Sequence, residues 1–288
     1  MLNLDAENEL FATTYTPPSA RSLARLPDLV RALAPLFGPD DVILGEGDGD
    51  TCTPGIYAGR AWCPTPSALA RLAAAGAVPV RAPALAILRR VNHRRFCADL
   101  GEQLPGARYV TRIDELAEVI AGETPTGDWL LKRPFGFAGR GRRKVTRGPL
   151  DPSAQTWVAS SLREGDGLQV EPWVERSGDF ALHGYVSRKS EITLGEPTQQ
   201  ECNETGVWQR SSRETDLDPG ERAALTSSAL ASGEALAGAG YFGPFGVDAF
   251  RFHHGDRLAF NARCEINARY SMGWAIGMGA LRPDLDAS

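Results

Sequence analysis

Residues 129–145 combine a lysine with closely spaced glycines between two apolar segments. Lys132 ends the first segment, and Gly136, Gly139 and Gly141 follow it. Glycine permits backbone conformations in which successive N–H groups point into one concavity, and such concavities bind anions. Lys132 could add an ammonium group for a phosphate. We interpret the segment as a phosphate-binding loop, although a plain hairpin with a flexible basic tip stays open as the alternative. It is not a P-loop, because no Gly-Lys-Ser/Thr follows.

Two acids and one amide occupy a pair of apolar segments near the C-terminus. Glu265 and Asn267 are two residues apart, so they point to the same face of a strand. Asp248 lies on the neighbouring segment. Two carboxylates and an amide oxygen form an all-oxygen ligand set that suits Mg²⁺ shared with phosphates. The alternation is equally compatible with a strand whose polar side chains face water.

Residues 168–179 run from an apolar strand into a turn that ends on an acid. Glu171 is followed by the aromatic and aliphatic pair Trp173-Val174, and Asp179 comes after the turn. Such a crossing can hold a flat heterocycle through backbone hydrogen bonds, with Asp179 reaching a ribose hydroxyl. Taken alone, an ordinary strand end with a solvated charge run is the preferred interpretation.

The bulk properties exclude several classes of partner. The net charge is −5 and basic residues cluster only locally, as in Arg140–Lys144, so we expect neither nucleic acid nor a membrane surface as partner. No apolar run approaches the roughly 18–20 residues that cross a bilayer, and the acidic N-terminus lacks the form of a signal peptide. The five scattered cysteines fit reduced thiols and indicate a cytoplasmic protein.

The first ninety residues alternate between helical and strand patterns, which predicts a small α/β unit. The expected elements are a helix over 19–37, a strand over 41–45, a helix over 68–75 with Thr65 or Ser67 as N-cap, and a strand over 77–81.

The rest of the chain reads as a mixture of helices and strands in α+β order. A polar stretch over 191–214 has no clear period and predicts a hairpin with a mobile loop. The expected helices cover 85–100, 113–121, 152–162, 219–237 and 273–281, and the expected strands cover 109–111, 129–132, 143–146, 168–171, 180–186, 245–252 and 257–266.

Together and in this order, the three segments resemble the ATP-grasp superfamily. The pattern is strand, lysine and glycine-rich loop, then the Glu-x-aromatic-aliphatic hinge, then Gly-x-Asp followed by Glu-Ile-Asn-x-Arg. The resemblance implies a mixed α/β and α+β protein with an ATP-grasp fold, in which two α+β subdomains clasp ATP. Subdomain A with the glycine-rich loop would cover 91–166, and subdomain B with the Mg²⁺ site would cover 167–288. A small α/β pre-ATP-grasp domain would cover 1–90.

The resemblance also implies which residues contact the phosphates. Lys132 would hold an ATP phosphate, and Arg94 or Arg95 falls where many members keep a second phosphate-binding lysine. The glycine-rich loop would close over the phosphates as a lid. The loop residues are Gly136, Phe137, Ala138, Gly139 and Gly141.

For the nucleoside, the resemblance implies a hinge between the two subdomains. Glu171 and Val174 would flank the adenine edge, and Trp173 and Val174 would supply hinge backbone. Asp179 would meet the ribose.

For the metal, the resemblance implies that Asp248, Glu265 and Asn267 hold one or two Mg²⁺ ions, with Glu265 bridging. Arg269 would face the γ-phosphate or the acyl phosphate.

Three positions depart from the superfamily pattern. Asp248 and Glu265 are separated by more residues than is usual, so the hairpin is longer and a bulge could move Asp248 out of the site. Gly246 stands where peptide-forming relatives place an arginine. The polar stretch offers Arg210, and not a lysine, as a γ-phosphate contact.

The implied function is an ATP- and Mg²⁺-dependent ligase. It would activate a carboxylate as an acyl phosphate for attack by an amine, less often by a thiol, on an amino acid, a peptide or a small metabolite. The partners would be small-molecule carboxylates and amines, and a homodimer is compatible with this interpretation. Two alternatives stay open: a kinase of the same fold that phosphorylates a small molecule, and a non-catalytic ATP-binding protein.

Overall fold

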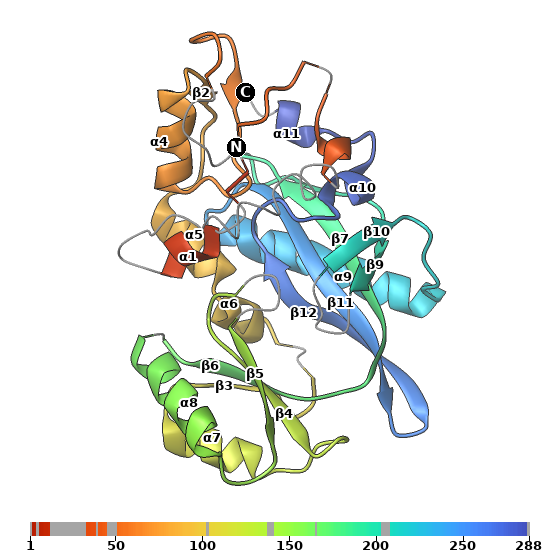
Figure 1. Ribbon diagram of the computed structural model, residues 1–288. Helices are drawn as coiled ribbons and strands as arrows, with labels where there is room; N and C mark the ends of the chain where they lie inside the picture. Colours follow the sequence, from red (N-terminus) through yellow and green to blue (C-terminus); the bar gives the residue numbers. More distant parts are fainter. Residues whose placement is uncertain are drawn as a thin grey trace.

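The computed structural model describes residues 2–3, 6–11, 33–38, 40–44, 51–101, 104–136, 141–164, 166–202 and 208–286. Two antiparallel sheets form most of the described molecule, and they lie one after the other along its long axis (Figure 1). A smaller α/β part lies at the end that carries the N-terminus.

The smaller sheet has four strands in the order β3-β6-β4-β5. Trp129, Leu131 and Val170 point to one, apolar face, and the other face carries Lys132 and Glu171 beside the apolar Leu130. The apolar face packs against two helices and forms a separate core that includes Trp129, Leu131 and Val170. The elements are β3 (Arg108–Val110), α7 (Ile113–Ile120), β4 (Asp128–Lys132), β5 (Arg142–Thr146), α8 (Pro152–Glu164) and β6 (Leu168–Pro172).

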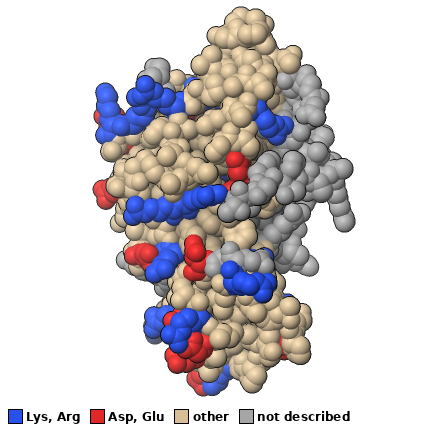
Figure 2. Space-filling model, turned by 90° about the vertical axis from the view of Figure 1, so that its left-hand side faces the viewer, with Lys and Arg blue, Asp and Glu red and all other residues tan. Residues whose placement is uncertain are grey.

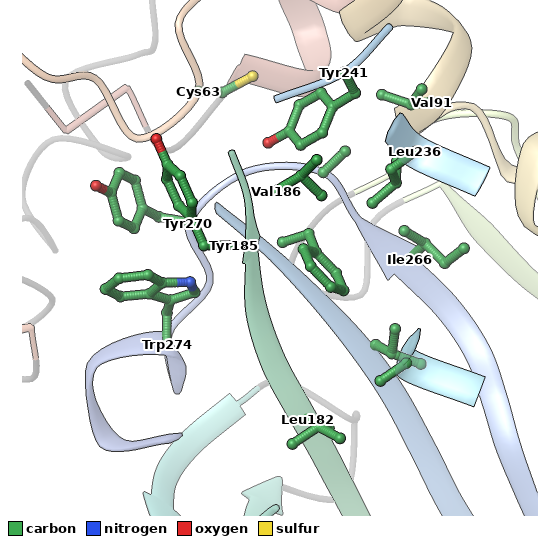
Figure 3. Packing of buried hydrophobic residues seen from close by; sticks show 14 of the residues in the cluster. Cys63, Val91, Leu182, Tyr185, Val186, Leu236, Tyr241, Ile266, Tyr270 and Trp274 are labelled. Atoms are coloured by element: carbon green, nitrogen blue, oxygen red, sulfur yellow. The ribbon is translucent and has the colours of Figure 1, made fainter. Parts of the chain in front are cut away.

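The larger sheet has six strands in the order β10-β9-β7-β11-β12, with β8 also paired to β7. One face packs against the long helix α9, where Leu182, Val186, Leu236 and Ile266 lie in the main core (Figure 3). The elements are β7 (Arg176–Val186), β8 (Ile192–Leu194), β9 (Thr198–Cys202), β10 (Trp208–Ser212), α9 (Pro219–Gly238), β11 (Gly243–His254) and β12 (Arg257–Asn267).

Helix α9 begins where local chemistry favours a helix start. The Asp218 carboxylate accepts the Glu221 N–H at 2.8 Å, and the Glu221 carboxylate accepts the Asp218 N–H at 3.1 Å. Pro219 occupies the first helical position. This reciprocal capping satisfies two N–H groups that the helix leaves without internal partners.

The N-terminal part is built from short elements around a two-stranded parallel sheet. They are α1 (Ala6–Phe11), the 3₁₀ helix η1 (Ala34–Leu36), β1 (Ala58–Gly59), α4 (Pro66–Ala74) and β2 (Val78–Pro79). Thr65 is the N-cap residue of α4, but its side chain makes no capping hydrogen bond. The Glu9 carboxylate from α1 accepts the Ser67 N–H at 2.9 Å instead.

The helix expected over 85–100 is two helices, α5 (Leu85–Asn92) and α6 (Arg94–Asp99). His93 between them has an extended backbone, and its Nδ1 accepts the Arg95 N–H at 3.1 Å, which caps α6. The Arg94 N–H donates to the Pro134 carbonyl oxygen at 3.0 Å. The break therefore ties the start of α6 to the chain that leaves β4.

Two further expectations need correction. Residues 41–44, expected as a strand, are not in a sheet, and β2 pairs with β1 instead. Val42 is 47% exposed, so its apolar character did not indicate burial. The final helix ends early as α10 (Trp274–Met278), because Gly279 takes a positive φ of 58°, and a further helix α11 (Pro283–Asp286) follows. Most of the helix expected over 19–37 lies outside the described residues.

The described surface shows no large area of one charge sign in the view of Figure 2, where basic and acidic residues lie in small separate groups. Among the helices of the described ranges, none has both the length and the apolar character needed to span a bilayer.

Candidate functional site

A buried ion pair lies on the polar face of the smaller sheet. Lys132, the last residue of β4, contacts the Glu171 Oε1 of β6 through its Nζ. Lys132 is 6% exposed and Glu171 is 4% exposed. The strand register places Lys132 opposite Gln169, and Leu130 opposite Glu171, so these side chains share one face. Burying two charges costs free energy that the pair's own attraction only partly offsets, which is typical of a functional position.

Arg94 connects this sheet to the larger one. Its Nε donates to the Arg133 carbonyl oxygen at 3.0 Å, next to Lys132, and its NH1 lies 2.9 Å from the Glu265 Oε2 on β12. Burial opposes the charged form, but the Glu265 carboxylate raises the pKa of Arg94 above its ordinary value. Lys132 and Glu265 therefore lie in one charged network and not on opposite sides of the molecule.

The three oxygen side chains of the larger sheet lie together. Asp248 on β11 pairs with Glu265 on β12, and Gly246 pairs with Asn267. The Asn267 Nδ2 donates to the Asp248 Oδ2 at 2.9 Å, and the Gln200 Nε2 donates to Oδ1 at 3.1 Å. The strands do contain a bulge, but it falls between this pair and the hairpin turn. The bulge absorbs the extra residues, so Asp248 stays opposite Glu265.

The two carboxylates have different electrostatic surroundings. Burial, and then the neighbouring Glu265, raise the pKa of Asp248 to about 6. Burial would also raise the pKa of Glu265, but the charges of Arg94, Lys132 and Arg269 lower it below its ordinary value. Two neighbouring half-buried carboxylates repel each other, and a bound cation removes that repulsion.

The donor set fits a hard cation. Asp248, Glu265 and Asn267 offer only oxygen ligands, which Mg²⁺ prefers and which it commonly shares with phosphates. Within the described ranges, no group of three or more His, Cys, Asp or Glu side chains is arranged to hold a metal. Mg²⁺ prefers six oxygen ligands, so three protein ligands would leave positions for a substrate or water.

The hinge segment after β6 is only partly free for a ligand. The Trp173 N–H donates to the Asp128 carbonyl at 2.9 Å, and the Trp173 carbonyl accepts from the Thr126 hydroxyl at 2.9 Å. The Trp173 N–H is therefore already used in the fold, so Val174 is better placed than Trp173 to give a heterocycle a backbone hydrogen bond. Asp179 is in an ion pair with Arg176 at 2.9 Å.

The ends of the glycine-rich loop are described, whereas Phe137, Ala138 and Gly139 lie outside the described residues. Gly141 has a φ of 71°, and its carbonyl oxygen accepts the Arg133 N–H at 2.7 Å, which closes the base of the loop. A positive φ favours glycine. Gly136 lies at the other end of the loop.

Arg142 follows this loop and lies directly opposite Lys132 in the register of β4 and β5. It therefore shares the polar face of the sheet. Burial, and then the Arg176 guanidinium of the larger sheet, lower the pKa of Arg142.

The two predicted arginines near the γ-phosphate have different positions. The Arg269 Nε donates to the Glu7 Oε1 at 2.6 Å, and its charge also acts on Asp248 and Glu265. Arg210 is in an exposed ion pair with Glu201. Neighbours along β9 and β10 point to opposite faces, and Gln200 points to Asp248, so Arg210 and Glu201 point away from the carboxylates. The structure thus does not bring Arg210 into the site.

Sequence reasoning missed a set of polar residues in the N-terminal segment and on the sheets. Glu7 and Glu9 are 6% and 8% exposed, and Glu7 contacts Arg269 across 262 residues of sequence. The two acids lie between the apolar residues Ala6 and Leu10 of α1, but their partners cannot be read from the sequence. The missed residues are Asn3, Glu7, Glu9, Arg142, Arg176 and Gln200.

The structure resembles solved structures of two carboxylases and a synthetase. The biotin carboxylase domain of the 2-oxoglutarate carboxylase from Hydrogenobacter thermophilus, solved with MgADP, ADP and bicarbonate, superposes with a TM-score of 0.53 at 13% identity over 75% of this chain and 51% of that one. Rhizobium etli pyruvate carboxylase has a TM-score of 0.53 at 16% identity over 72% and 18%. D-alanyl-alanine synthetase A from Vibrio cholerae has a TM-score of 0.50 at 13% identity over 76% and 66%.

These similarities define the fold. The chain is a mixed α/β protein with the fold of the ATP-grasp superfamily. It spans less than two thirds of the length of each of the three chains. No protein-family profile matches the sequence, and no curated protein matches it in sequence.

Proposed function

We propose that the protein is an ATP- and Mg²⁺-dependent ligase that activates a carboxylate for attack by an amine. The observation that supports this most is Arg94, which links the chain beside Lys132 to Glu265 at 2.9 Å. Cations of one sheet and carboxylates of the other thereby meet in one place. A triphosphate with a metal ion needs both, because the phosphates need cations and the metal needs oxygen ligands.

The proposed nucleotide contacts follow from the positions of the side chains. Lys132 would bind a phosphate in exchange for part of its contact with Glu171, and the loop from Gly136 to Gly141 would cover the phosphates. Glu171 and Val174 would lie at the adenine edge, and Asp179 would lie at the ribose. Their common surroundings support this proposal, since all come from β4, β6, β7 or the adjoining loops.

Asp248, Glu265 and Asn267 would hold Mg²⁺, which would supply positive charge to the transferred phosphoryl group. The protein's own cations would add to that charge: Arg94 beside Glu265, and Arg269 two residues beyond Asn267. In the proposed reaction, a substrate carboxylate oxygen attacks the γ-phosphorus and ADP leaves. An amine then attacks the acyl carbon and phosphate leaves, and exclusion of water by the loop would protect the acyl phosphate from hydrolysis.

The test is a thermal-shift and ADP-release screen with Mg-ATP against carboxylic acids, each with and without amines. We expect acid-dependent ADP release that Lys132→Ala and Glu265→Ala abolish. Undiminished turnover in both variants would refute these assignments. Hydroxamate formation with hydroxylamine reports an acyl phosphate, whereas a phosphorylated hydroxyl would indicate a kinase. Nucleotide binding without ADP release would indicate a non-catalytic ATP-binding protein.

The finer organisation belongs to the same proposal. Residues 91–166 would act as the subdomain with the phosphate loop, 167–288 as the subdomain with the metal site, and 1–90 as a preceding α/β domain. The five cysteines are all free thiols, which supports a reducing, cytoplasmic location. A homodimer is compatible with this arrangement.

A further inference from the structure

A buried histidine lies beside the proposed metal ligands. His183 on β7 is 1% exposed and pairs with Gly246 of β11, which pairs in turn with Asn267 of β12. Directly opposite residues on neighbouring strands share one face of a sheet, and residues two apart on a strand do as well. His183 therefore points to the face of the larger sheet that carries Asp248.

Three glycines enclose the imidazole ring of His183. A Cβ atom at Gly246 would lie 2.9 Å from its Nδ1, one at Gly273 would lie 2.7 Å from Nε2, and one at Gly277 would lie 2.6 Å from Cδ2. Side chains at these positions would displace the ring, because protein interiors are close-packed. The glycines therefore leave space for the imidazole and fix its place.

Both nitrogens of the ring contact hydroxyl groups. The Ser271 Oγ lies 3.1 Å from Nδ1, and the Thr198 Oγ1 lies 3.5 Å from Nε2. Burial lowers the pKa of His183 to about 3, so the ring is neutral near pH 7 and carries one N–H. The Thr198 hydroxyl donates its proton to the Ala181 carbonyl at 3.3 Å, so towards His183 its oxygen can only accept. Nε2 therefore carries the proton of the ring, and Nδ1 accepts the Ser271 proton.

This arrangement gives the Ser271 hydroxyl a defined polarity. Its proton is directed to His183, so the lone pairs of its oxygen remain available as acceptors. Ser271 is half-buried, and its Oγ has no other hydrogen bond among the described residues. The oxygen lies over Gly246, because a Cβ atom there would be 3.2 Å from it. Such an acceptor attracts an N–H group and repels a carboxylate.

The pair is unsuited to proton abstraction. A general base works best when its pKa lies near the working pH, whereas burial holds the pKa of His183 at about 3. The fixed hydrogen bond between His183 and Ser271 therefore favours binding over acid–base chemistry.

We infer that Ser271 binds the attacking amine of the proposed ligase through an N–H···Oγ hydrogen bond, and that His183 is the positioning residue that makes Ser271 an acceptor. The inference rests on the proposed function and narrows it, because it places the amine, and not the acid, over Gly246. A thiol would gain less from this contact, since S–H is a weak donor.

The orientation of the ring can be measured by nitrogen-15 NMR of protein labelled at its four histidines. His93→Gln, His253→Gln and His254→Gln identify the other three sets of signals, so His183 is assigned without being changed. We expect a neutral His183 ring with its proton on Nε2 at pH 7. Ser271→Ala should shift the Nδ1 signal towards that of a nitrogen without a hydrogen-bond donor. A proton on Nδ1 in the wild-type protein would overturn the inference.

The amine contact is tested with methylamine, which is added to wild-type protein in the presence of Mg-ADP. We expect a saturable shift of the His183 Nδ1 signal, because an N–H bound to the Ser271 oxygen changes the hydrogen bond that Ser271 donates. Ser271→Ala removes only a half-buried hydroxyl and should weaken methylamine binding at least about 10-fold, the value of one hydrogen bond to a charged group.

Ser211→Ala is the matched control. The Ser211 Oγ is also close to the ring, since it lies 2.8 Å from the position of a Gly273 Cβ atom, but it already accepts the Trp208 Nε1–H at 2.9 Å. Its oxygen is thus used for the fold, and its loss should leave methylamine binding unchanged.

The outcomes separate this inference from the proposed function. Equal methylamine affinity in wild type and Ser271→Ala, or no response in wild-type protein that binds Mg-ADP, would show that the inference alone is wrong. Wild-type protein that does not bind Mg-ADP would contradict the proposed function and, with it, the amine site.

Discussion

The two sheets share one design and differ in the charge of the face opposite their apolar cores. Each has an apolar face that packs against helices, α7 and α8 on the smaller sheet and α9 on the larger. The polar face of the smaller sheet carries the cations Lys132 and Arg142, directly opposite each other. The polar face of the larger sheet carries the oxygen ligands Asp248, Glu265 and Asn267.

In the proposed function, this difference gives the two sheets complementary roles. Cations directly opposite each other on neighbouring strands are destabilising, and so are adjacent half-buried carboxylates. Glu171 offsets part of this repulsion at Lys132, and Arg94 offsets part of it at Glu265; in the proposed function, a metal–phosphate complex would offset the rest. Arg94 already joins the two sheets, because it donates to the Arg133 carbonyl oxygen next to Lys132 and contacts the Glu265 carboxylate.

The largest effect is expected from Lys132→Met on the smaller sheet. The substitution leaves the Glu171 carboxylate buried without its cation, which costs about 3–5 kcal/mol of unfolding free energy, and it removes a phosphate contact. Urea unfolding and ADP binding would measure the two losses. In the double variant with Glu171→Gln, most of the stability should return but nucleotide binding should not. If ADP binding returns together with stability, Lys132 has only a structural role.

On the larger sheet, Glu265→Gln should abolish the dependence of nucleotide binding on Mg²⁺. It removes one proposed metal ligand and leaves the buried Arg94 guanidinium without its carboxylate. We expect at least about a 100-fold loss of ADP release, since losing an outer-shell partner alone costs 10–100-fold. Chelation of Mg²⁺ with EDTA should have the same effect on the wild-type protein. A variant that still responds to Mg²⁺ as the wild type does would place the metal elsewhere.

Arg142 and Arg143 allow a matched test of the polar face of the smaller sheet. They are neighbours on β5 and point to opposite faces, and Arg143 donates to the Ser153 carbonyl and hydroxyl at 3.2 and 3.0 Å. Arg142→Gln should weaken Mg-ADP binding by about 10–100-fold, the value of a charge-assisted hydrogen bond. Arg143→Gln should lower only the melting temperature. Calorimetric titration measures the binding, and equal affinities for the two variants would contradict the assignment of faces.

The smallest effect concerns the dependence of stability on pH. The pKa of Asp248 is raised from 3.8 to about 6, so the native state binds a proton more tightly than the unfolded chain. Its contribution to stability is complete below pH 4 and is lost as the pH rises through 6. Asp248→Asn should remove this loss of unfolding free energy, which is up to roughly 3 kcal/mol at pH 7. One altered hydrogen bond in the variant reduces the net gain. Urea unfolding of apoprotein at pH 4.5 and 7.5 checks it, and a pH-independent difference between variant and wild type would contradict it.

Sequence patterns predicted the sheets better than the contacts between them. Strand β4 and helix α7 were expected within about one residue, because each has its own period and end signals. The prediction of a strand over 41–45 was wrong for residues 41–44, because a short apolar run does not specify a strand partner. Arg210 was predicted to contact the γ-phosphate, but its side chain points away from the site because residues of β10 alternate between the two faces. The sequence does not specify how β9 and β10 align, so it could not give this orientation.

The site could be predicted in its residue types but not in its pairings. The Lys132–Glu171 and Arg94–Glu265 ion pairs join segments far apart in sequence, and no local pattern specifies such partners. The same holds for Glu7 and Arg269, which are 262 residues apart. Asp248 lies opposite Glu265 because the bulge falls between this pair and the hairpin turn. The amino-acid composition does not specify the position of a bulge.

A crystal structure with Mg²⁺ and a non-hydrolysable ATP analogue tests the central claim most directly. The account predicts that the Lys132 Nζ contacts a phosphate oxygen while Glu265 and Asn267 ligate an ion bound to the same phosphate chain. A nucleotide bound elsewhere, or an ion held by residues of another region, would contradict it.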